Sequence, residues 1–373
     1  MTALLPLAEL EAAVHAATRA ALGSGPLETG PLVRAILDRS ARYTSDRDRL
    51  AAPADPTGDL AARAAFFTIA DAPKLGVPLA ELASRGALPA GRPLRVVDLG
   101  AGCGAMSLGL VASLDAPLDI VALDHDRGAL VIAADAVRAL AARRTHAITF
   151  ATREVDATTA PVPPADLVLL GTLLNELPAP ERLTLVQRAL AAVWPDGAVI
   201  VIEPALRDTS RALHELRDAV LAAGAGHVFA PCTRAGAPCP ALADPSDWCH
   251  EHRTLALPPR TAELARLTHL RDGGMKFAYL VLRPTPGALA EGPAAWRIVS
   301  APHAQKGKLE MFGCSDAGRV PLRLLKRNRA DGNRAFERAE RGDVLIVEAA
   351  TSTPERVELD RTTTVERRRP GGG

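Results

Sequence analysis

A short apolar run followed by alternating glycines is the feature that most constrains the fold. The segment Leu94–Leu110 reads LRVVDLGAGCGAMSLGL. Its first six residues suit a buried parallel strand, because they are mostly apolar and partly β-branched. Gly100, Gly102 and Gly104 follow, and from Ala105 the pattern is compatible with a helix. A strand, a tight glycine turn and a helix are the layout of a nucleotide site, because a backbone without Cβ atoms can approach a ligand closely.

The spacing of these glycines resembles the first motif of class I S-adenosylmethionine-dependent methyltransferases. The motif is D-x-G-x-G-x-G, beginning at Asp98, and differs from the dinucleotide spacing G-x-G-x-x-G. In the resembled family the loop passes under the methionine part of the cofactor, and the acid lies near its amino group. The resemblance implies cofactor-binding roles for Asp98, Gly100, Gly102 and Gly104.

Strand and helix patterns alternate over residues 94–204, which predicts an α/β fold with a parallel sheet. Asp124 stands at the carboxyl end of the second predicted strand, where an acid can accept hydrogen bonds from ribose hydroxyls. Asp156 follows the third strand, where the resembled family often holds the adenine amino group. We therefore expect Asp124 and Asp156 to bind the cofactor. The predicted strands cover residues 94–99, 118–123, 148–153, 166–171 and 198–202.

The end of the fourth predicted strand shows no recognisable catalytic group. It reads LLGTLLNELP and lacks the N/D-P-P-aromatic motif of many base-directed amino-methyltransferases. No cysteine nucleophile for base-carbon methylation follows the fourth or the fifth strand. Asn175 and Glu176 either face a substrate or serve the structure, so the sequence leaves the catalytic residues unknown.

Composition and the positions of proline and glycine predict how the chain is divided into regions. Hydrophobic residues make up 48% of the 373 residues, enough for a substantial core, and 44 Lys and Arg nearly balance 43 Asp and Glu. The net charge therefore favours no particular partner. The predicted regions are a helical N-terminal region (1–90), a methyltransferase-like domain (91–285) with a Cys-rich insertion (228–252), a basic β-rich module (294–350) and a tail (351–373).

Five cysteines and the N-terminal residues bear on the cellular compartment. An odd cysteine count does not suggest a disulfide framework, and MTALLPLAELEAAVHAA has no basic targeting region. No run of about 18 apolar residues occurs, so we expect no membrane span. These features predict a cytoplasmic protein with reduced thiols and no membrane partner.

Three of the cysteines lie in a loop rich in Pro, Gly, Ala and Asp. Cys232, Cys239 and Cys249 fall within HVFAPCTRAGAPCPALADPSDWCHEH. A loop this long needs something to hold it, and three thiolates on a metal centre would supply folding free energy. Zinc or a [4Fe–4S] cluster would need a fourth ligand, although four cysteines outside the glycine loop match the count of a cluster. The candidates for this ligand are His250, His252 and Cys314.

The C-terminal module carries local positive charge. Trp296–Arg341 contains eleven Lys and Arg against five Asp and Glu. Basic side chains at this density attract a phosphate backbone and make binding depend on salt. The module is therefore a candidate RNA-binding surface, and a solvated arginine-rich face is the alternative.

A combination of motifs then resembles one family. The motifs are VDLGAGCGA, NELP, APC…PCP…DWCH and a basic C-terminal segment with a cysteine and RGD. They resemble the methyltransferase-like proteins associated with the small ribosomal subunit, known from mitochondrial ribosome assembly and with bacterial relatives. The resemblance covers roughly residues 30–350 and is most specific at Asp247–His250.

This resemblance implies a cofactor set, a partner and a function. It implies binding to the small ribosomal subunit and its rRNA, in ribosome assembly or translation, by a protein that holds S-adenosylmethionine and an iron–sulfur cluster. Two alternatives stay open: an active S-adenosylmethionine-dependent rRNA methyltransferase, and a small-molecule methyltransferase with structural zinc. The cluster ligands implied by the resemblance are Cys232, Cys239, Cys249 and Cys314.

Overall fold

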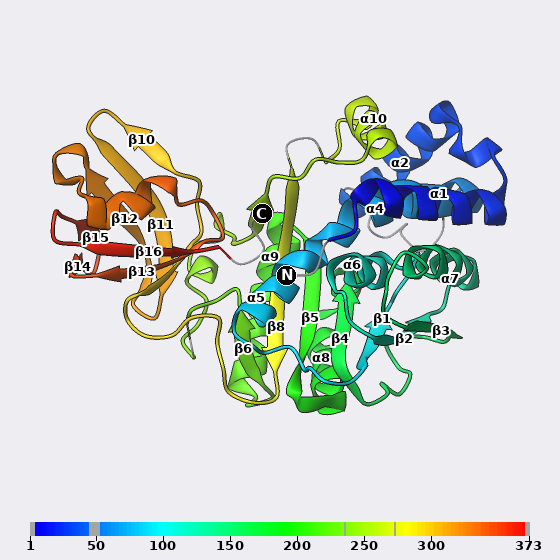
Figure 1. Cartoon of the computed structure of the whole chain (residues 1–373), viewed down its shortest axis with the longest axis horizontal. Coiled ribbons are helices and arrows are strands. Elements are labelled where there is room, and N and C mark those ends of the chain that lie inside the picture. The colour runs from blue at the N-terminus through cyan, green and yellow to red at the C-terminus, as the bar shows by residue number, and fades with distance from the viewer. Residues whose placement is uncertain (1–3, 45–52, 235, 272–273, 370–373) are drawn as a thin grey trace. The chain divides into compact units, whose positions relative to one another are not determined.

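The computed structural model describes residues 4–44, 53–234, 236–271 and 274–369 (Figure 1). Parts of the predicted N-terminal region (1–3, 45–52), one residue of the Cys-rich insertion (235) and the end of the predicted tail (370–373) lie outside the described residues. The chain divides into two compact units. The first consists of Met1–Gly76, Pro89–Leu173 and Thr254–Met275, and the second of Val77–Leu88, Leu174–Arg253 and Lys276–Gly373.

Four parallel strands form the sheet of the first unit, in the order β3-β2-β1-β4. Val96 of β1 lies opposite Ile120 of β2 and Leu167 of β4, and all three side chains are buried. Burial on both faces explains the near-continuous apolar runs of β1 and β4. The strands are β1 (Leu94–Leu99), β2 (Leu118–Asp124), β3 (Ile148–Glu154) and β4 (Ala165–Gly171).

The helices of the first unit pack on this sheet and on one another (Figure 1). In α1, Leu10, Val14 and Ala17 are buried at helical spacing, and this face packs against α7. On α6, Gly109 has no Cβ, and a Cβ there would lie 2.2 Å from the carbonyl oxygen of Ala72. The helices are α1 (Leu7–Leu22), α2 (Thr29–Thr44), α3 (Pro56–Ala62), α4 (Ile69–Asp71), α6 (Ala105–Ser113), α7 (Arg127–Ala141) and α10 (Pro259–Thr268), with a π-helical segment, Arg63–Thr68, between α3 and α4.

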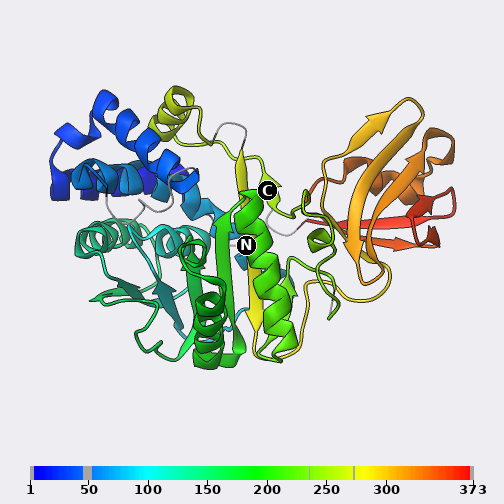
Figure 2. The same cartoon turned by 180° about the vertical axis from the view of Figure 1, so that it is seen from behind.

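In the second unit, β8 is antiparallel to both β5 and β6. Strand β5 begins at Val193 rather than at 198, and the carbonyls of Pro195 and Gly197 accept hydrogen bonds from Thr285 and Arg283. Figure 2 shows the long green helix α9 in front of the yellow strand β8. The elements are α5 (Gly76–Ser84), α8 (Ala179–Ala192), β5 (Val193–Pro204), α9 (Arg207–Ala222), β6 (His227–Ala230), β7 (Glu251–Arg253) and β8 (Met275–Arg283).

A separate sheet forms the C-terminal module, in the order β14-β15-β12-β11-β9-β13-β16, with β10 paired to β11. Its core includes Trp296, Met311 and Phe336. The prediction of a tail over 351–373 differs from the structure, because β14 to β16 continue this sheet to Arg368. The strands are β9 (Ala295–Ile298), β10 (His303–Gln305), β11 (Lys308–Ser315), β12 (Gly318–Leu325), β13 (Val344–Glu348), β14 (Thr351–Thr353), β15 (Arg356–Leu359) and β16 (Thr364–Arg368).

The chain therefore has a Rossmann-like sheet of the α/β class, N-terminal helices and a β-rich C-terminal module, which confirms this part of the fold prediction. Among the described residues, no helix is both long and apolar enough to cross a membrane.

Candidate functional site

The glycine loop between β1 and α6 is tightly packed. Gly100 has φ +68°, and a Cβ on it would lie 2.9 Å from Leu173 Cδ1. Gly104 has φ +83°, caps the start of α6, and would bring a Cβ within 3.0 Å of Ala133 Cβ. Only glycine suits both the left-handed backbone and the close approach at these two positions. The loop thus presents backbone, with little side chain, to any ligand at the end of β1.

Asp98 lies under this loop and is fully buried. Its Oδ2 accepts hydrogen bonds from the Ser107 backbone N–H at 3.0 Å and from the Ser107 hydroxyl at 2.6 Å. Its Oδ1 is buried and has no hydrogen-bond partner among the described residues. Burial raises the pKa of Asp98 to about 6, although the bonds from Ser107 oppose the shift. A buried carboxylate oxygen without a partner fits the amino group of a methionine-derived cofactor.

Asp124 holds the glycine loop to the end of β2. Its Oδ2 accepts the backbone N–H of Gly102 at 2.8 Å, and its Oδ1 accepts that of Asp126 at 2.8 Å. The residue is 7% exposed. Each carboxylate oxygen can accept one more hydrogen bond, and a ribose hydroxyl is a donor of the suitable kind.

Asp156 lies in an exposed turn after β3. Its Oδ1 accepts the backbone N–H of Thr158 at 2.8 Å and the hydroxyl of Thr158 at 2.6 Å, and these bonds lower the pKa of Asp156. The same turn joins the end of β2, because the N–H of Val155 donates to the carbonyl of Asp124 at 2.9 Å. Asp124 is thus bonded directly to the glycine loop, Asp98 to Ser107 at the start of α6, and the turn of Asp156 joins Asp124 through the backbone.

A buried carboxylate that the sequence analysis missed holds the NELP segment of the second unit. Glu203, at the end of β5, accepts the N–H of Leu174 at 2.9 Å and the side-chain amide of Asn175 at 2.7 Å. Burial raises the pKa of Glu203 to about 7. The carboxylate of Glu203 therefore orients the side chain of Asn175. The position of Glu203, directly after the apolar run of β5, was the sequence feature that could have predicted this pair.

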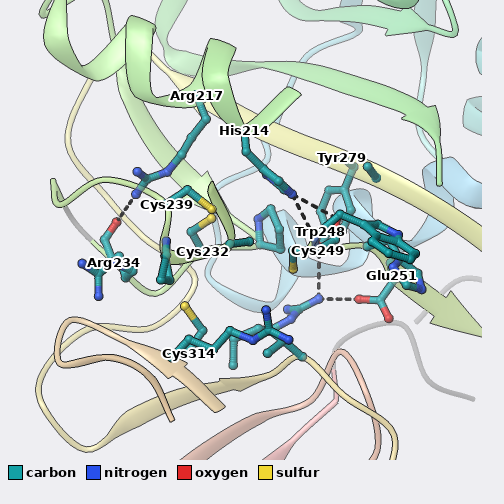
Figure 3. Close-up of a pocket in the computed structure, with 18 of the residues that line it drawn as sticks. His214, Arg217, Cys232, Arg234, Cys239, Trp248, Cys249, Glu251, Tyr279 and Cys314 are labelled. Carbon is teal, nitrogen blue, oxygen red and sulfur yellow. Dashed lines mark hydrogen bonds and ion pairs between the residues drawn. The ribbon is translucent and has the colours of Figure 1, made fainter. Parts of the chain in front are cut away.

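Four cysteines of the second unit line one cavity of about 50 Å³ (Figure 3). Cys232, Cys239 and Cys249 come from the loop after β6, and Cys314 comes from β11 of the C-terminal module. In Figure 3 their sulfur atoms face a common space. His250 also lines the cavity. Of the two predicted histidine alternatives, His252 is exposed and is not among the lining residues.

The cysteine loop is tied to β11 by the two side chains that directly follow Cys232. The hydroxyl of Thr233 donates to the carbonyl of Cys314 at 2.8 Å, and Arg234 donates to the carbonyl of Ser315 at 2.7 Å. These bonds bring together cysteines separated by more than eighty positions in the sequence, which spacing alone cannot reveal.

One face of α9 holds the cysteine loop, and the sequence analysis missed it. Arg217 is fully buried and donates to the carbonyls of Arg234 and Ala237 at 3.0 and 2.7 Å. Arg211 donates to the carbonyls of Ala241, Leu242, Asp244 and Asp247. His214 Nε2 lies 3.1 Å from the carbonyl oxygen of Cys249, and burial lowers the pKa of His214 to about 4. Arg211, His214 and Arg217 recur at helical spacing on α9. This spacing, next to a Pro- and Gly-rich loop, was the sequence feature that could have predicted their contact with the loop.

The DWCH segment and the RGD turn meet at the same place. A Cβ on Gly342 would lie 2.3 Å from Glu251 Oε1, so only glycine fits there. Arg253 donates to the carbonyl of Gly342 at 3.2 Å, and Arg341 donates to that of His250 at 3.3 Å. Two motifs that the sequence shows far apart therefore form one wall of the cysteine cavity.

The chemistry of the cavity suits a soft metal centre, although its geometry is open. Burial raises the pKa of the Cys239 thiol to about 11 and that of Cys314 to about 12, so these thiols are neutral without a bound cation. Within the described part of the chain, no three His, Cys, Asp or Glu side chains are arranged to hold a metal ion. The four thiols fit the donor set of an iron–sulfur cluster or zinc, and they would have to draw together to bind either.

Ion pairs neutralise much of the basic segment Trp296–Arg341. Six of its eleven cations pair with carboxylates: Arg297, Lys308, Arg319, Arg323, Arg329 and Arg334. Lys306, Lys326 and Arg327 are exposed and have no ion pair among the described residues. These three residues lie at one end of the sheet. There, Lys308 of β11 stands opposite Leu325 of β12, and the N–H of Lys326 donates to the carbonyl of Gly307 at 2.8 Å. We call Lys306, Lys326 and Arg327 the basic end.

The chain is similar in sequence to one protein family and, at low structural similarity, to solved methyltransferases. A sequence model of the family described as mitochondrial small ribosomal subunit Rsm22 matches residues 74–346. Magnesium protoporphyrin IX methyltransferase (ChlM) from Synechocystis PCC 6803, solved with bound SAM, is similar with a TM-score of 0.37 and 12% identity over 67% of this chain and 97% of that one. A putative O-methyltransferase from Nostoc punctiforme PCC 73102 has a TM-score of 0.37 and 16% identity over 70% of this chain and 68% of that one. No curated protein matches the chain in sequence.

Proposed function

The chain belongs to the Rsm22 family, and from this membership we propose that it binds the small ribosomal subunit as a methyltransferase-like factor in ribosome assembly or translation. The observation that carries the proposal is the family match over residues 74–346, which includes the glycine loop, the cysteine loop and the basic end. Affinity purification of the tagged chain tests it. Small-subunit RNA and proteins should be enriched over those of the large subunit, and equal recovery of both would contradict the proposal.

The first unit is proposed to bind S-adenosylmethionine. When bound, this cofactor supplies an electrophilic methyl group. The supporting residues are those of the glycine loop, with Asp98 Oδ1 toward the amino group, Asp124 toward the ribose and Asp156 toward the adenine. Gly100 and Gly104 keep the loop free of Cβ atoms where the backbone is closest to its neighbours.

The second unit is proposed to hold a [4Fe–4S] cluster on Cys232, Cys239, Cys249 and Cys314. The support is one cavity lined by four thiols, three of them on a loop that α9 fixes by its backbone carbonyls. A bound cluster would favour the thiolate forms that burial opposes. Zinc on the same residues is the alternative, and metal analysis of the protein purified without oxygen separates the two.

Contact with rRNA is proposed to run through the basic end, since its three cations are exposed and free of ion pairs among the described residues. Cations in this state can pair with phosphates without first breaking an internal pair. The proposed RNA-binding surface is therefore the basic end, in place of all eleven basic residues of the segment.

Methyl transfer to rRNA is a second candidate function, favoured by the orientation of Asn175 by Glu203. Mass-spectrometric mapping of small-subunit RNA from cells with and without the protein tests it. Loss of a methylated nucleotide, restored by the wild-type chain and not by an Asn175→Ala variant, would support an enzyme. Identical modification in both cells would leave the protein as a binding factor.

A further inference from the structure

The guanidinium group of Arg63, which belongs to no sequence motif, lies beside the glycine loop of the first unit. Arg63 begins the π-helical segment Arg63–Thr68. Its Nη2 would lie 3.5 Å from a Cβ placed on Gly102. π-Helical turns inside helices occur often at functional sites, because they shift one side chain out of helical register. In this segment the side chain of Arg63 places its guanidinium group beside the backbone of Gly102, which a ligand can approach.

The only ion pair of Arg63 among the described residues is with Asp126. Arg63 Nη1 lies 2.6 Å from Asp126 Oδ2, and the two side chains are 22% and 27% exposed. Asp126 is also occupied elsewhere, because its Oδ1 accepts the N–H of Ala129 at the start of α7. Nη1 of the guanidinium is therefore engaged, and Nη2 donates no hydrogen bond within the described residues. An arginine fork can bind two oxygens of a second carboxylate while keeping the first partner.

The loop thus carries opposite charges where a zwitterion would need them. Asp98 Oδ1 is a buried acceptor without a partner, and Arg63 is a cation with donors to spare. We propose that Arg63 binds the carboxylate of the methionine moiety of the cofactor, while Asp98 takes its amino group. This inference rests on the proposed cofactor site and adds the residue that recognises the carboxylate.

The test compares S-adenosylhomocysteine with its decarboxylated analogue S-adenosyl-3-thiopropylamine, which keeps the amino group. Binding to the full-length protein is measured by calorimetry. The wild type should prefer S-adenosylhomocysteine about 10- to 100-fold, the range of a charge-assisted hydrogen bond. Arg63→Met should abolish this preference by weakening S-adenosylhomocysteine alone, and Arg63→Lys should restore part of it. Arg138→Met, which removes an exposed cation paired with Asp135 on α7, should change neither affinity.

Three results would overturn the inference in different ways. If Arg63→Met weakened both ligands equally while the protein kept its thermal melting temperature, Arg63 would shape the loop without reading the carboxylate. If Arg63→Met failed to fold, the wild type and Arg63→Lys would decide: no preference for S-adenosylhomocysteine in the wild type, or an unreduced preference in Arg63→Lys, would refute the role. Failure of both ligands to bind the wild type would remove the cofactor site itself, and the inference with it.

Discussion

The carboxylate of Asp218 accepts the backbone N–H of Cys239, with Oδ2 2.9 Å from the amide nitrogen. The same carboxylate pairs with Arg217, whose guanidinium also donates to two carbonyls of the cysteine loop. A helix therefore positions the cysteine loop through the loop backbone. Ordering the loop backbone in this way lowers the conformational entropy that the loop would lose on binding the proposed metal centre.

Replacing Arg217 by Met should lower the free energy of unfolding by about 3 kcal/mol, the lower end of the range for breaking a buried pair, since Asp218 is 25% exposed. The reason is that Asp218 and two loop carbonyls would lose their fully buried partner. Chemical denaturation measures the change. Arg207→Met is the matched control on α9, because Arg207 is 56% exposed, and it should cost under about 0.5 kcal/mol. Equal losses in the two variants would contradict the role of Arg217.

Replacing Cys249 by Ser should remove the metal centre. Anaerobically purified wild type should be brown, with broad visible absorption and about four iron and four sulfide per chain. Cys249→Ser should lose most of the iron and colour, because one of the four cavity thiols is gone. Cys103→Ser is the control, since Cys103 is buried in the glycine loop of the other unit. A colourless wild type with stoichiometric zinc would refute the cluster, and a brown Cys249→Ser would remove this ligand.

Much of the fold follows from local sequence patterns. The predicted strand 94–99 coincides with β1, because burial on both faces gives a continuous apolar run bounded by glycines. The strands β14 to β16 escape prediction because they are short and carry many Thr, Glu and Arg residues. Their buried residues, Val357, Leu359 and Val365, are too few to show alternation without their partner strands.

The candidate sites could be predicted only where the motif is local. The glycine loop and Asp124 lie one strand apart, and the strand-end rule brings them together. The supports of the cysteine cavity come from residues that look like a solvated helix face, such as Arg211 and Arg217. Every residue has a backbone carbonyl, so the residue type at the accepting position does not indicate such a hydrogen bond. These contacts are therefore seen only in the structure.

The affinity for S-adenosylhomocysteine should fall as pH decreases from 7 to 5. In the free protein burial raises the pKa of Asp98 to about 6, so the carboxylate is ionised at pH 7 and mostly protonated at pH 5. The ionised form attracts the ligand's ammonium group, and each pH unit below 6 should therefore weaken binding up to about tenfold. Calorimetry across this range measures it. Asp98→Asn should bind weakly with a flat profile, and a profile identical to wild type would exclude Asp98 from the site.

Sedimentation with small ribosomal subunits tests the central claim most directly. Purified chain is mixed with small and large subunits and followed through sucrose gradients at increasing salt. Wild type should travel with the small subunit at low salt, and Lys306→Ala, Lys326→Ala and Arg327→Ala together should lower the salt dependence by about three ions. Alanine at the ion-paired Arg329, Arg334 and Arg356 should change it less. A wild-type chain that stays at the top of the gradient at every salt concentration would contradict the account.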